Sequence, residues 1–332
     1  MKVKELGEFG VIDRLASLIQ RRGAGRTDAF GYKLVVDVGD DTAAWRPGAA
    51  TELATTDTMV EGVHFSQASI PWYDLGWKVM AANVSDIAAM GGLPLYALVT
   101  LGLPPETDVA RLDELYGGML DLAAEYRFRI VGGDMVRSEA VFVTVSLTGA
   151  TDLAPMLRSS AQAGDQVAVT GFLGLSAAGL KVLQESLDVG AAEERLTAAH
   201  RTPRPLVDQG RVLAQESVMA DMDVSDGLVD DLGKLIRASG VSARIKAAQV
   251  PLEAELVKAF PEECLEMALY GGEDYALVFC APPPVMARAL AKLPGESAVI
   301  GELFDSPPGT VSVIDSGGNE LTPSRLGWDH YR

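Results

Sequence analysis

The sequence predicts an α/β protein of two domains, each built from layers of helices and strands. Short strand-like segments alternate with amphipathic helical segments in both halves of the chain. This pattern is typical of a two-layer α/β or α+β fold, and not of a helical bundle or an all-β sandwich. A chain of 332 residues exceeds one ordinary domain of about 150 residues. We place the boundary in a polar connector, which gives domains 1–150 and 151–332.

The first domain is expected to combine a small β meander with three helices. Apolar residues at helical spacing predict a helix over residues 9–20, ended by Gly23-Ala24-Gly25. Asp74 is expected to cap a second helix that runs to Met90. Strands 33–38, 43–45 and 53–56 form the predicted meander, with Pro47-Gly48 as a hairpin turn. The other expected elements are strand 95–103, helix 108–126, strand 129–131 and strand 141–149.

The second domain is expected to repeat this alternation of strands and helices. Ser225-Asp226-Gly227 is predicted to open a helix that runs to Ala238. The other expected elements are strand 166–170, helices 175–187 and 204–216, strands 218–222 and 275–280, helix 285–292 and a final β pair.

Composition limits the partners of the chain. The 46 acidic residues outnumber the 28 Lys and Arg residues and give a formal net charge of −18. Such a surface repels nucleic acid and anionic membranes, so any phosphorylated ligand calls for divalent cations. The two cysteines, Cys264 and Cys280, are too few for a disulfide framework. No signal region or bilayer-length apolar run is visible, so we expect a cytoplasmic protein.

Short acidic motifs suggest a magnesium and phosphate site. They are Gly39-Asp40-Asp41, Thr55-Thr56-Asp57, Ser85-Asp86, Gly132-Gly133-Asp134 and Asp223-Val224-Ser225-Asp226-Gly227. Most of these carboxylates follow strand-like segments, where ligands gather in α/β folds. Hard oxygen ligands favour Mg²⁺, although each motif alone could be an ordinary turn. No Walker A or protein-kinase motif is present.

Several of these residues have structural alternatives that the sequence leaves open. Asp86 could be a solvated carboxylate or pair with Lys78. Ser225 or Asp226 could cap the helix that follows, and a metal-bound phosphate could also lie at that helix N-terminus. Arg158 could contact phosphate directly or be a surface residue.

Three further positions could contact a ligand. For His64, a core histidine is the favoured interpretation, and ligand binding is the alternative. Trp328 could belong to a satellite core or be a stacking platform for an aromatic ligand. Glu273 and Asp274 follow two glycines, which would let these carboxylates approach a ligand closely.

Over nearly its whole length, the chain resembles the thiamine-monophosphate kinase family. The motifs that carry this resemblance are the acidic motifs above, 56–65, 83–91, Arg158 with Gly164-Asp165, 224–228 and 271–275. The resemblance implies the fold of aminoimidazole-ribotide synthetase, in a homodimer that pairs the sheets of the N-terminal domains. It implies that domain 1–150 binds metal and ATP and forms the dimer, while domain 151–332 completes the active site.

The resemblance also implies a role for each matching residue. The expected Mg²⁺ ligands are Asp41, Thr55, Thr56, Asp57, Asp86, Asp134, Asp223 and Asp226. The residues expected near ATP are Gly133, Asp134, Arg158 and Ser225, and those near thiamine monophosphate are His64, Glu273 and Trp328.

The implied reaction is direct in-line transfer of phosphate from ATP to thiamine monophosphate with several Mg²⁺ ions. The acceptor is a phosphate oxygen that is already anionic, so neither a covalent nucleophile nor a general base is expected. The alternatives are another ATP-dependent synthetase of the same superfamily, or a nucleotide- and metal-binding regulator without catalytic activity.

Overall fold

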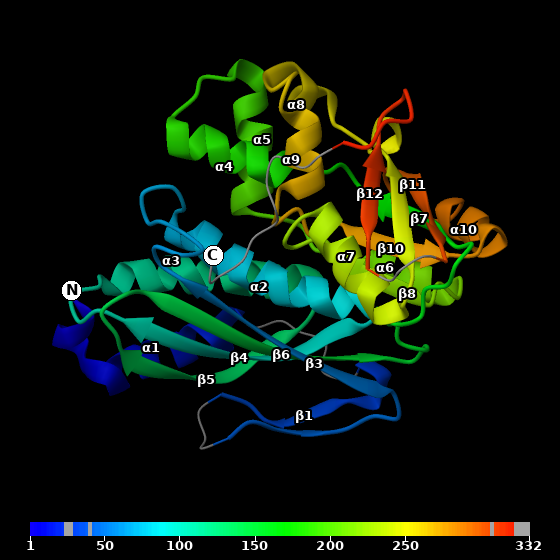
Figure 1. Cartoon of the computed structure of the whole chain (residues 1–332). Helices are drawn as coiled ribbons and strands as arrows, with labels where there is room; N and C mark the ends of the chain where they lie inside the picture. Colours follow the sequence, from blue (N-terminus) through cyan, green and yellow to red (C-terminus); the bar gives the residue numbers. More distant parts are fainter. Residues whose placement is uncertain (23–28, 39–41, 306–308, 322–332) are drawn as a thin grey trace. The chain divides into compact units, whose positions relative to one another are not determined.

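The computed structural model describes residues 1–22, 29–38, 42–305 and 309–321. The chain forms two compact units, one of residues 1–87 and 92–152, the other of residues 88–91 and 153–332 (Figure 1). Asp41, Gly23-Ala24-Gly25 and Trp328 lie outside the described residues.

A four-stranded sheet forms the centre of the first unit. Its strands follow the order β3-β6-β4-β5, and only β4 and β5 are parallel. Their bounds are β3 Thr51–Val60, β4 Leu93–Leu103, β5 Arg129–Arg137 and β6 Phe142–Thr151. β3 and β5 are therefore much longer than predicted, because the Thr-rich and Gly-rich segments continue into the ladders. As a result, Asp57 and Asp134 lie inside strands, and the prediction that they follow strands is wrong.

The predicted β meander is also wrong. β1 (Lys33–Val36) and β2 (Ala44–Arg46) form a separate two-stranded sheet, whereas β3 pairs with β6. Pro47-Gly48 is therefore not a hairpin turn between paired strands. The small ribbon packs through Trp45, whose ring stacks on Tyr96 of β4 with centroids 4.9 Å apart.

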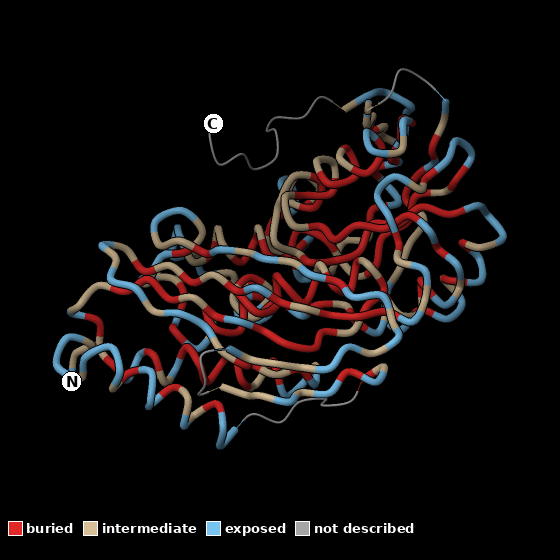
Figure 2. The backbone as a smooth tube through the Cα atoms, turned by 90° about the horizontal axis from the view of Figure 1, so that it is seen from below, coloured by how far each residue is buried: buried red, intermediate tan, exposed pale blue. Residues whose placement is uncertain are grey.

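The first unit contains helices as well as the four-stranded sheet. They are α1 Val3–Arg22, the short η1 Ala29–Gly31, α2 Trp72–Ala89 and α3 Val109–Tyr126. α1 is amphipathic: Val11, Leu15 and Ile19 are buried while Phe9 is exposed, and Figure 2 shows buried and exposed residues alternating along it. Asp74 lies in the first turn of α2 and not at its cap, because the helix begins directly after Pro71.

The two faces of the four-stranded sheet differ. Leu53 and Gly149 face Ile87 of α2, since a Cβ at Gly149 would lie 2.8 Å from the Ile87 side chain. The other face carries Thr56 and Thr58, and it includes Leu98 and Val136, which are 42% and 41% exposed. Part of this second face is thus an exposed mixture of apolar and hydroxyl side chains.

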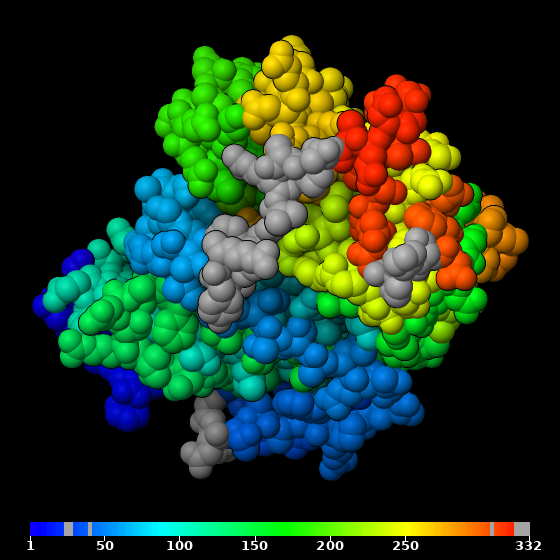
Figure 3. Space-filling view, in the orientation of Figure 1, coloured from blue at the N-terminus to red at the C-terminus, as the bar shows by residue number. Residues whose placement is uncertain are grey.

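A six-stranded mixed sheet forms the centre of the second unit. Its order is β12-β9-β11-β7-β10-β8, and only β12 and β9 are parallel. The bounds are β7 Gln166–Thr170, β8 Ala220–Asp223, β9 Ser242–Lys246, β10 Leu277–Ala281, β11 Ser297–Phe304 and β12 Val311–Ile314. The expected final β pair is wrong, because β11 and β12 each pair with β9 and not with each other. β12 is an edge strand and reaches the surface in Figure 3.

Helices cover both faces of this sheet. Leu232 and Leu235 of α7 pack with Val167 and Val169 on one face. Leu213 of α6 and Met286 of α10 pack with Phe279 on the other. The bounds are α4 Leu175–Glu185, α5 Glu193–Arg201, α6 Val207–Gln215, α7 Leu228–Ser239, α8 Ala254–Ala259, α9 Cys264–Tyr270 and α10 Pro283–Leu290, with η2 Gly190–Ala192 and η3 Ala247–Gln249.

Three short helices, α5, α8 and α9, were not predicted from the sequence. Each has nine residues or fewer, too few turns to show a helical period clearly. With α4 they bury a small core that includes Leu196, Leu256 and Phe260. Figure 3 shows α4 and α5 beside α8 and α9 as one lobe of the surface.

The prediction of a two-domain mixed α/β fold is confirmed. Across the described parts of the chain, no helix is long and apolar enough to cross a membrane.

Candidate functional site

In the first unit, side chains on one face of β3 lie next to the last turn of α2. Thr55 and Asp57 alternate with Thr56 along β3 and share the face of buried Leu53, which contacts the end of α2. The Thr55 hydroxyl donates a hydrogen bond to Asp86 Oδ2. Thr55, Asp57 and Asp86 therefore lie on one side of the sheet, as two half-buried carboxylates next to a hydroxyl.

Thr56 faces the opposite side of the sheet. Its hydroxyl lies 3.0 Å from the carbonyl oxygen of Val145 and 3.1 Å from Ser146 Oγ. The structure therefore does not bring the Thr56 hydroxyl together with Asp86. Thr55 and Thr56 are consecutive residues of an extended strand, so their side chains point to opposite faces of the sheet.

Gly133 and Asp134 lie at the other edge of the same sheet. Asp57 pairs with Val145, Val145 with Val99 and Val99 with Gly133. Three strand spacings of about 4.8 Å place Gly133 roughly 14 Å from Asp57. Asp134 is exposed, and its carboxylate accepts the backbone N–H of Met135 at 2.8 Å. Within one chain, Asp134 therefore does not join Asp57.

His64 is half-buried, so the favoured interpretation as a core histidine is wrong. The backbone N–H of Val60 donates to His64 Nδ1 at 3.1 Å. Because Nδ1 accepts a hydrogen bond, the neutral ring carries its proton on Nε2. His64 can thus offer an N–H donor to an anionic ligand.

In the second unit, the acidic loop 223–227 lies against the glycine-rich loop 271–275. The N–H of Glu273 donates to the carbonyl of Ser225 at 2.8 Å, and that of Tyr275 donates to Val224 at 2.9 Å. A Cβ at Gly272 would lie 2.6 Å from the Ser225 oxygen, so only glycine permits this approach. The structure therefore brings together Asp223, Ser225, Asp226 and Glu273.

The capping of α7 differs from the prediction. Neither Ser225 nor Asp226 caps this helix through its side chain. Instead, Asp231 Oδ2 accepts the backbone N–H groups of Ser225, Asp226 and Gly227 at 2.9, 2.8 and 3.1 Å. The prediction of a side-chain cap at Ser225 or Asp226 is wrong because a carboxylate inside the helix turns back onto the loop. Of the backbone N–H groups at the N-terminus of α7, Asp231 thereby takes that of the N-cap residue, Gly227.

Lys234 balances the charge of this loop. Its ammonium group lies 2.7 Å from Asp231 Oδ1 and also pairs with Asp226 Oδ2. Asp231 is fully buried, and burial raises its pKa despite the hydrogen bond from Lys234. Burial lowers the pKa of Lys234, but the hydrogen bonds to Asp226 and Asp231 outweigh it and leave that pKa raised.

Asp274 plays a structural role that the sequence did not indicate. Its carboxylate accepts the backbone N–H groups of Gly174 at 2.6 Å and Ser176 at 3.0 Å, and so caps α4. Burial raises the pKa of Asp274 to about 7. Glu273 and Asp274 are both half-buried. Both carboxylate oxygens of Asp274 accept backbone N–H groups of the α4 start, so Glu273, whose side chain is 28% exposed, is the member of the pair that is left for a ligand.

Arg158 lies apart from these loops. It is exposed, and its carbonyl accepts the hydroxyl of Ser239 at 2.7 Å, at the C-terminal end of α7. Ser225 precedes the other end of this helix of 12 residues, which is about 18 Å long. The structure therefore does not place the Arg158 backbone beside Ser225.

Motif spacing did not predict three residues that hold the loops of the second unit in place: Asp231, Lys234 and Asp274. The three-residue separation of Asp231 and Lys234 on one helix was an available signal for their pairing. The described residues contain no preformed group of three or more His, Cys, Asp or Glu side chains that could hold a metal ion.

Comparison with known proteins identifies the family. The model of the AIR synthase related protein N-terminal domain matches residues 39–151, and that of its C-terminal domain matches residues 162–314. The thiamine-monophosphate kinase of Aquifex aeolicus is 37% identical over 85% of this chain and 88% of its own length. That of Escherichia coli K12 is 35% identical over 98% of both chains. The chain belongs to the thiamine-monophosphate kinase family.

Solved structures of this family share the whole fold. AaThiL complexed with AMPPCP and TMP has a TM-score of 0.77 and 33% identity, with 99% of both chains covered. The thiamine-monophosphate kinase of Stenotrophomonas maltophilia K279a has a TM-score of 0.79 and 31% identity, over 95% of this chain and 98% of that one. The hydrogenase maturation protein HypE in complex with ATP, at 19% identity and a TM-score of 0.75, shares the fold alone.

Proposed function

We propose that this chain phosphorylates thiamine monophosphate to thiamine diphosphate, with ATP as the phosphate donor. The observation that carries the proposal is its 33% identity, over 99% of the chain, to AaThiL complexed with AMPPCP and TMP. Those two ligands correspond to an ATP analogue and the acceptor. The carboxylate and hydroxyl side chains that each unit brings together support the same chemistry. An enzyme that uses ATP in this way belongs in the cytoplasm.

Mg²⁺ fits the residues that are present. Asp57 of β3 lies on the side of the sheet where Asp86 of α2 accepts the Thr55 hydroxyl, and Asp223 and Asp226 belong to one loop, so each unit offers carboxylate oxygens. Mg²⁺ keeps water ligands and is held by one or two carboxylates together with substrate phosphates, so a cage of three protein carboxylates is not required. When bound, Mg²⁺ would neutralise the phosphates of both substrates. Asp41, Thr55, Thr56 and Asp134 complete the proposed ligand set.

The chain's own residues would bind and orient the substrates. The nucleophile is an anionic phosphate oxygen of thiamine monophosphate, so positioning and charge neutralisation supply the catalysis without a general base. His64 can donate Nε2–H to a phosphate oxygen, because its Nδ1 is engaged by Val60. The carboxylate of Glu273 suits the positively charged thiazolium ring or the amino group of the acceptor, and Trp328 is assigned to stacking. Gly133, Arg158 and Ser225 are assigned to ATP.

A homodimer would complete this site. Gly133, next to Asp134, is about 14 Å from Asp57 in the same sheet, too far for one metal–nucleotide complex to be held by both carboxylates directly. Asp134 lies on the exposed face, level with Thr58, and Asp57 lies on the other face, so a dimer that joins the β5 edge of one sheet to the β3 edge of the other would bring Asp134 of one chain toward Asp57 of its partner while covering the exposed face. Exposed Leu98 and Val136 give this face apolar surface to bury.

Release of ADP from ATP tests the proposed activity. The purified chain is incubated with ATP and Mg²⁺ and with thiamine monophosphate, aminoimidazole precursors or no second substrate. We expect ADP and thiamine diphosphate in equal amounts only with thiamine monophosphate. Turnover with an aminoimidazole precursor would indicate a synthetase, and nucleotide binding without turnover on any substrate would indicate a regulator.

A further inference from the structure

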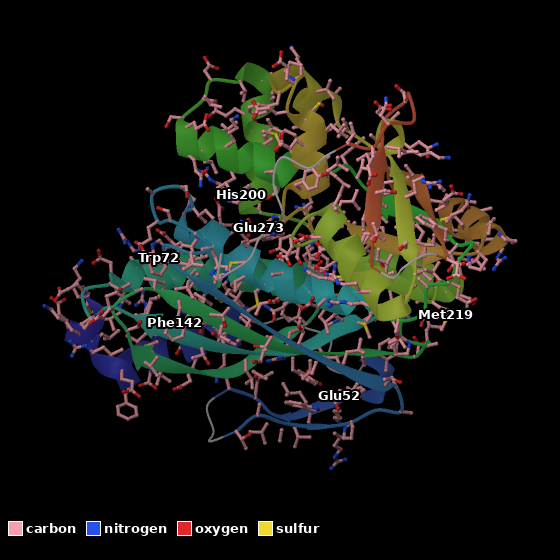
Figure 4. The ribbon with its side chains drawn as sticks, viewed as in Figure 1. Glu52, Trp72, Phe142, His200, Met219 and Glu273 are labelled. Carbon is pink, nitrogen blue, oxygen red and sulfur yellow. The ribbon has the colours of Figure 1, made fainter. Side chains whose placement is uncertain are left out.

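His200 is a buried imidazole that the proposed reaction does not use. It lies near the end of α5 and is 2% exposed. Its Nδ1 atom is 3.1 Å from the hydroxyl oxygen of Ser176 on α4 and 3.5 Å from Oε2 of Glu273 (Figure 4). An ionised carboxylate only accepts hydrogen bonds, so Glu273 favours the form of His200 with a proton on Nδ1.

The backbone that carries Glu273 is strained. Glu273 has a φ of 65° and Tyr275 a φ of 51°, both in the left-handed region that favours glycine. Such conformations persist only where the surroundings fix them, and they gather at functional sites. Here the N–H groups of both residues are bonded to the loop that holds Ser225 and Asp226. The chain thus maintains an unfavourable conformation that presents Glu273 beside this loop.

Asp274 and Ser176 close a ring of contacts around Glu273. The carboxylate of Asp274 holds the backbone N–H of Ser176, and the Ser176 hydroxyl holds His200. His200 in turn lies against Glu273, which is bonded to Asp274 in the chain. Ser176 is 1% exposed and His200 is 2% exposed, whereas 28% of the Glu273 side chain is accessible. The buried side chains of Ser176 and His200 can therefore fix the partly exposed carboxylate of Glu273.

We propose that His200, supported by Ser176, is a positioning residue that sets the direction of the Glu273 carboxylate. This inference rests on the proposed function, in which Glu273 binds the acceptor. His200 does not touch the substrate in this arrangement. It restricts Glu273 to the conformation that meets the acceptor, so its loss weakens binding of thiamine monophosphate and leaves ATP unaffected.

Two substitutions at His200 separate positioning from packing. His200→Leu removes the donor and keeps an apolar side chain in the buried position. His200→Asn places an amide nitrogen near the position of Nδ1 and keeps the donor. We expect His200→Leu to raise KM for thiamine monophosphate about 10-fold, because it removes the polar contact of 3.5 Å that holds the Glu273 carboxylate. KM for ATP and kcat should stay within about twofold, and His200→Asn should recover most of the loss.

A double-mutant cycle with Glu273→Gln tests whether His200 acts through Glu273. If it does, His200→Leu has little further effect on KM for thiamine monophosphate once Glu273 is neutral. Ser176→Ala, which keeps the backbone N–H used by Asp274, repeats the test with a smaller change if His200→Leu does not fold. Additive effects, or equal losses for both substrates, would overturn the role of His200. If the unmodified chain neither binds nor phosphorylates thiamine monophosphate, the proposed function fails and this inference with it.

Discussion

Asp231 Oδ1 lies 2.7 Å from the ammonium nitrogen of Lys234, one helical turn away on α7, while Oδ2 holds three consecutive backbone N–H groups of the loop 225–227. Asp231 is fully buried. One carboxylate therefore fixes the loop that carries Ser225 and Asp226, and Lys234 links its charge to that of Asp226.

Asp231→Asn should destabilise the second unit. The substitution removes the charge that holds Lys234 and weakens the bonds to the loop amides. The Lys234 side chain is 32% exposed, so solvent weakens its ion pair with Asp231. We therefore expect the free energy of unfolding to fall by about 2 to 4 kcal/mol. Urea unfolding should show a lower midpoint with an unchanged slope.

Asp230→Asn is the matched control for this change. Asp230 is the preceding helical residue and is only half-buried. Its substitution should alter stability by no more than about 0.5 kcal/mol. Equal effects of the two variants would show that Asp231 contributes only as a generic acidic residue near the start of α7.

Stability should fall as pH rises from about 4 to 7, in part because of Asp221. This residue is 2% exposed, and burial raises its pKa well above 3.8. Among the described residues, its Oδ2 has no hydrogen-bond partner. A folded-state pKa above the unfolded one means that the stabilising contribution is complete below the unfolded pKa and is lost as pH rises through the folded value. Asp165, Asp231 and Asp274 are shifted upwards by burial as well, so they act in the same direction.

Asp221→Asn isolates this contribution. The amide keeps an acceptor for the N–H of Met222, which now donates to Asp221 Oδ1 at 2.8 Å, but it does not ionise. We expect Tm of the variant to fall less steeply with pH between about 4 and 7 than that of the unmodified chain. Asp305→Asn, at an exposed position, should leave the pH dependence unchanged. Parallel curves for Asp221→Asn and the unmodified chain would contradict the prediction.

Chains that carry Asp57→Asn and Asp134→Asn should complement each other if the site is shared across a homodimer. Each variant alone should be nearly inactive. A mixture, unfolded and refolded together, should regain up to about a quarter of the activity, because half of the dimers are mixed and each mixed dimer holds one intact site. Sedimentation should show a dimer at micromolar concentration. A monomer with full activity, or a mixture without recovery, would rule out the shared site.

The short motifs that hold Asp57, Asp86, Asp223 and Asp226 could be read from the sequence, and the magnesium and phosphate site inferred from them stays a prediction. The sequence was sufficient for the mixed α/β fold, since β7 and α3 follow clear local patterns. Strand lengths were less predictable. Thr55 to Thr58 can continue a strand or end it, and only pairing with β6 decides this.

Contacts between distant segments could not be predicted from local patterns. Asp274 caps a helix that begins about 100 residues earlier in the chain, and His200 meets Glu273 across 73 residues. Each of these side chains has an ordinary local role in the sequence, as a turn residue or a helical residue. Their functions arise from the packing of α4, α5 and the loop 271–275, and not from the spacing of a motif.

Phosphoryl transfer should occur in a single displacement, without a phosphorylated Asp57. The acceptor phosphate is already a nucleophile at neutral pH, so an aspartyl phosphate would add a step without lowering a barrier. One in-line displacement inverts the configuration at phosphorus, whereas two displacements retain it. ATP with a chiral γ-thiophosphate should therefore give an inverted product. Asp57→Asn should lose activity through weaker Mg²⁺ binding and recover part of it at high Mg²⁺ concentration. Net retention, or a phosphoenzyme trapped in the absence of the acceptor, would establish the covalent route instead.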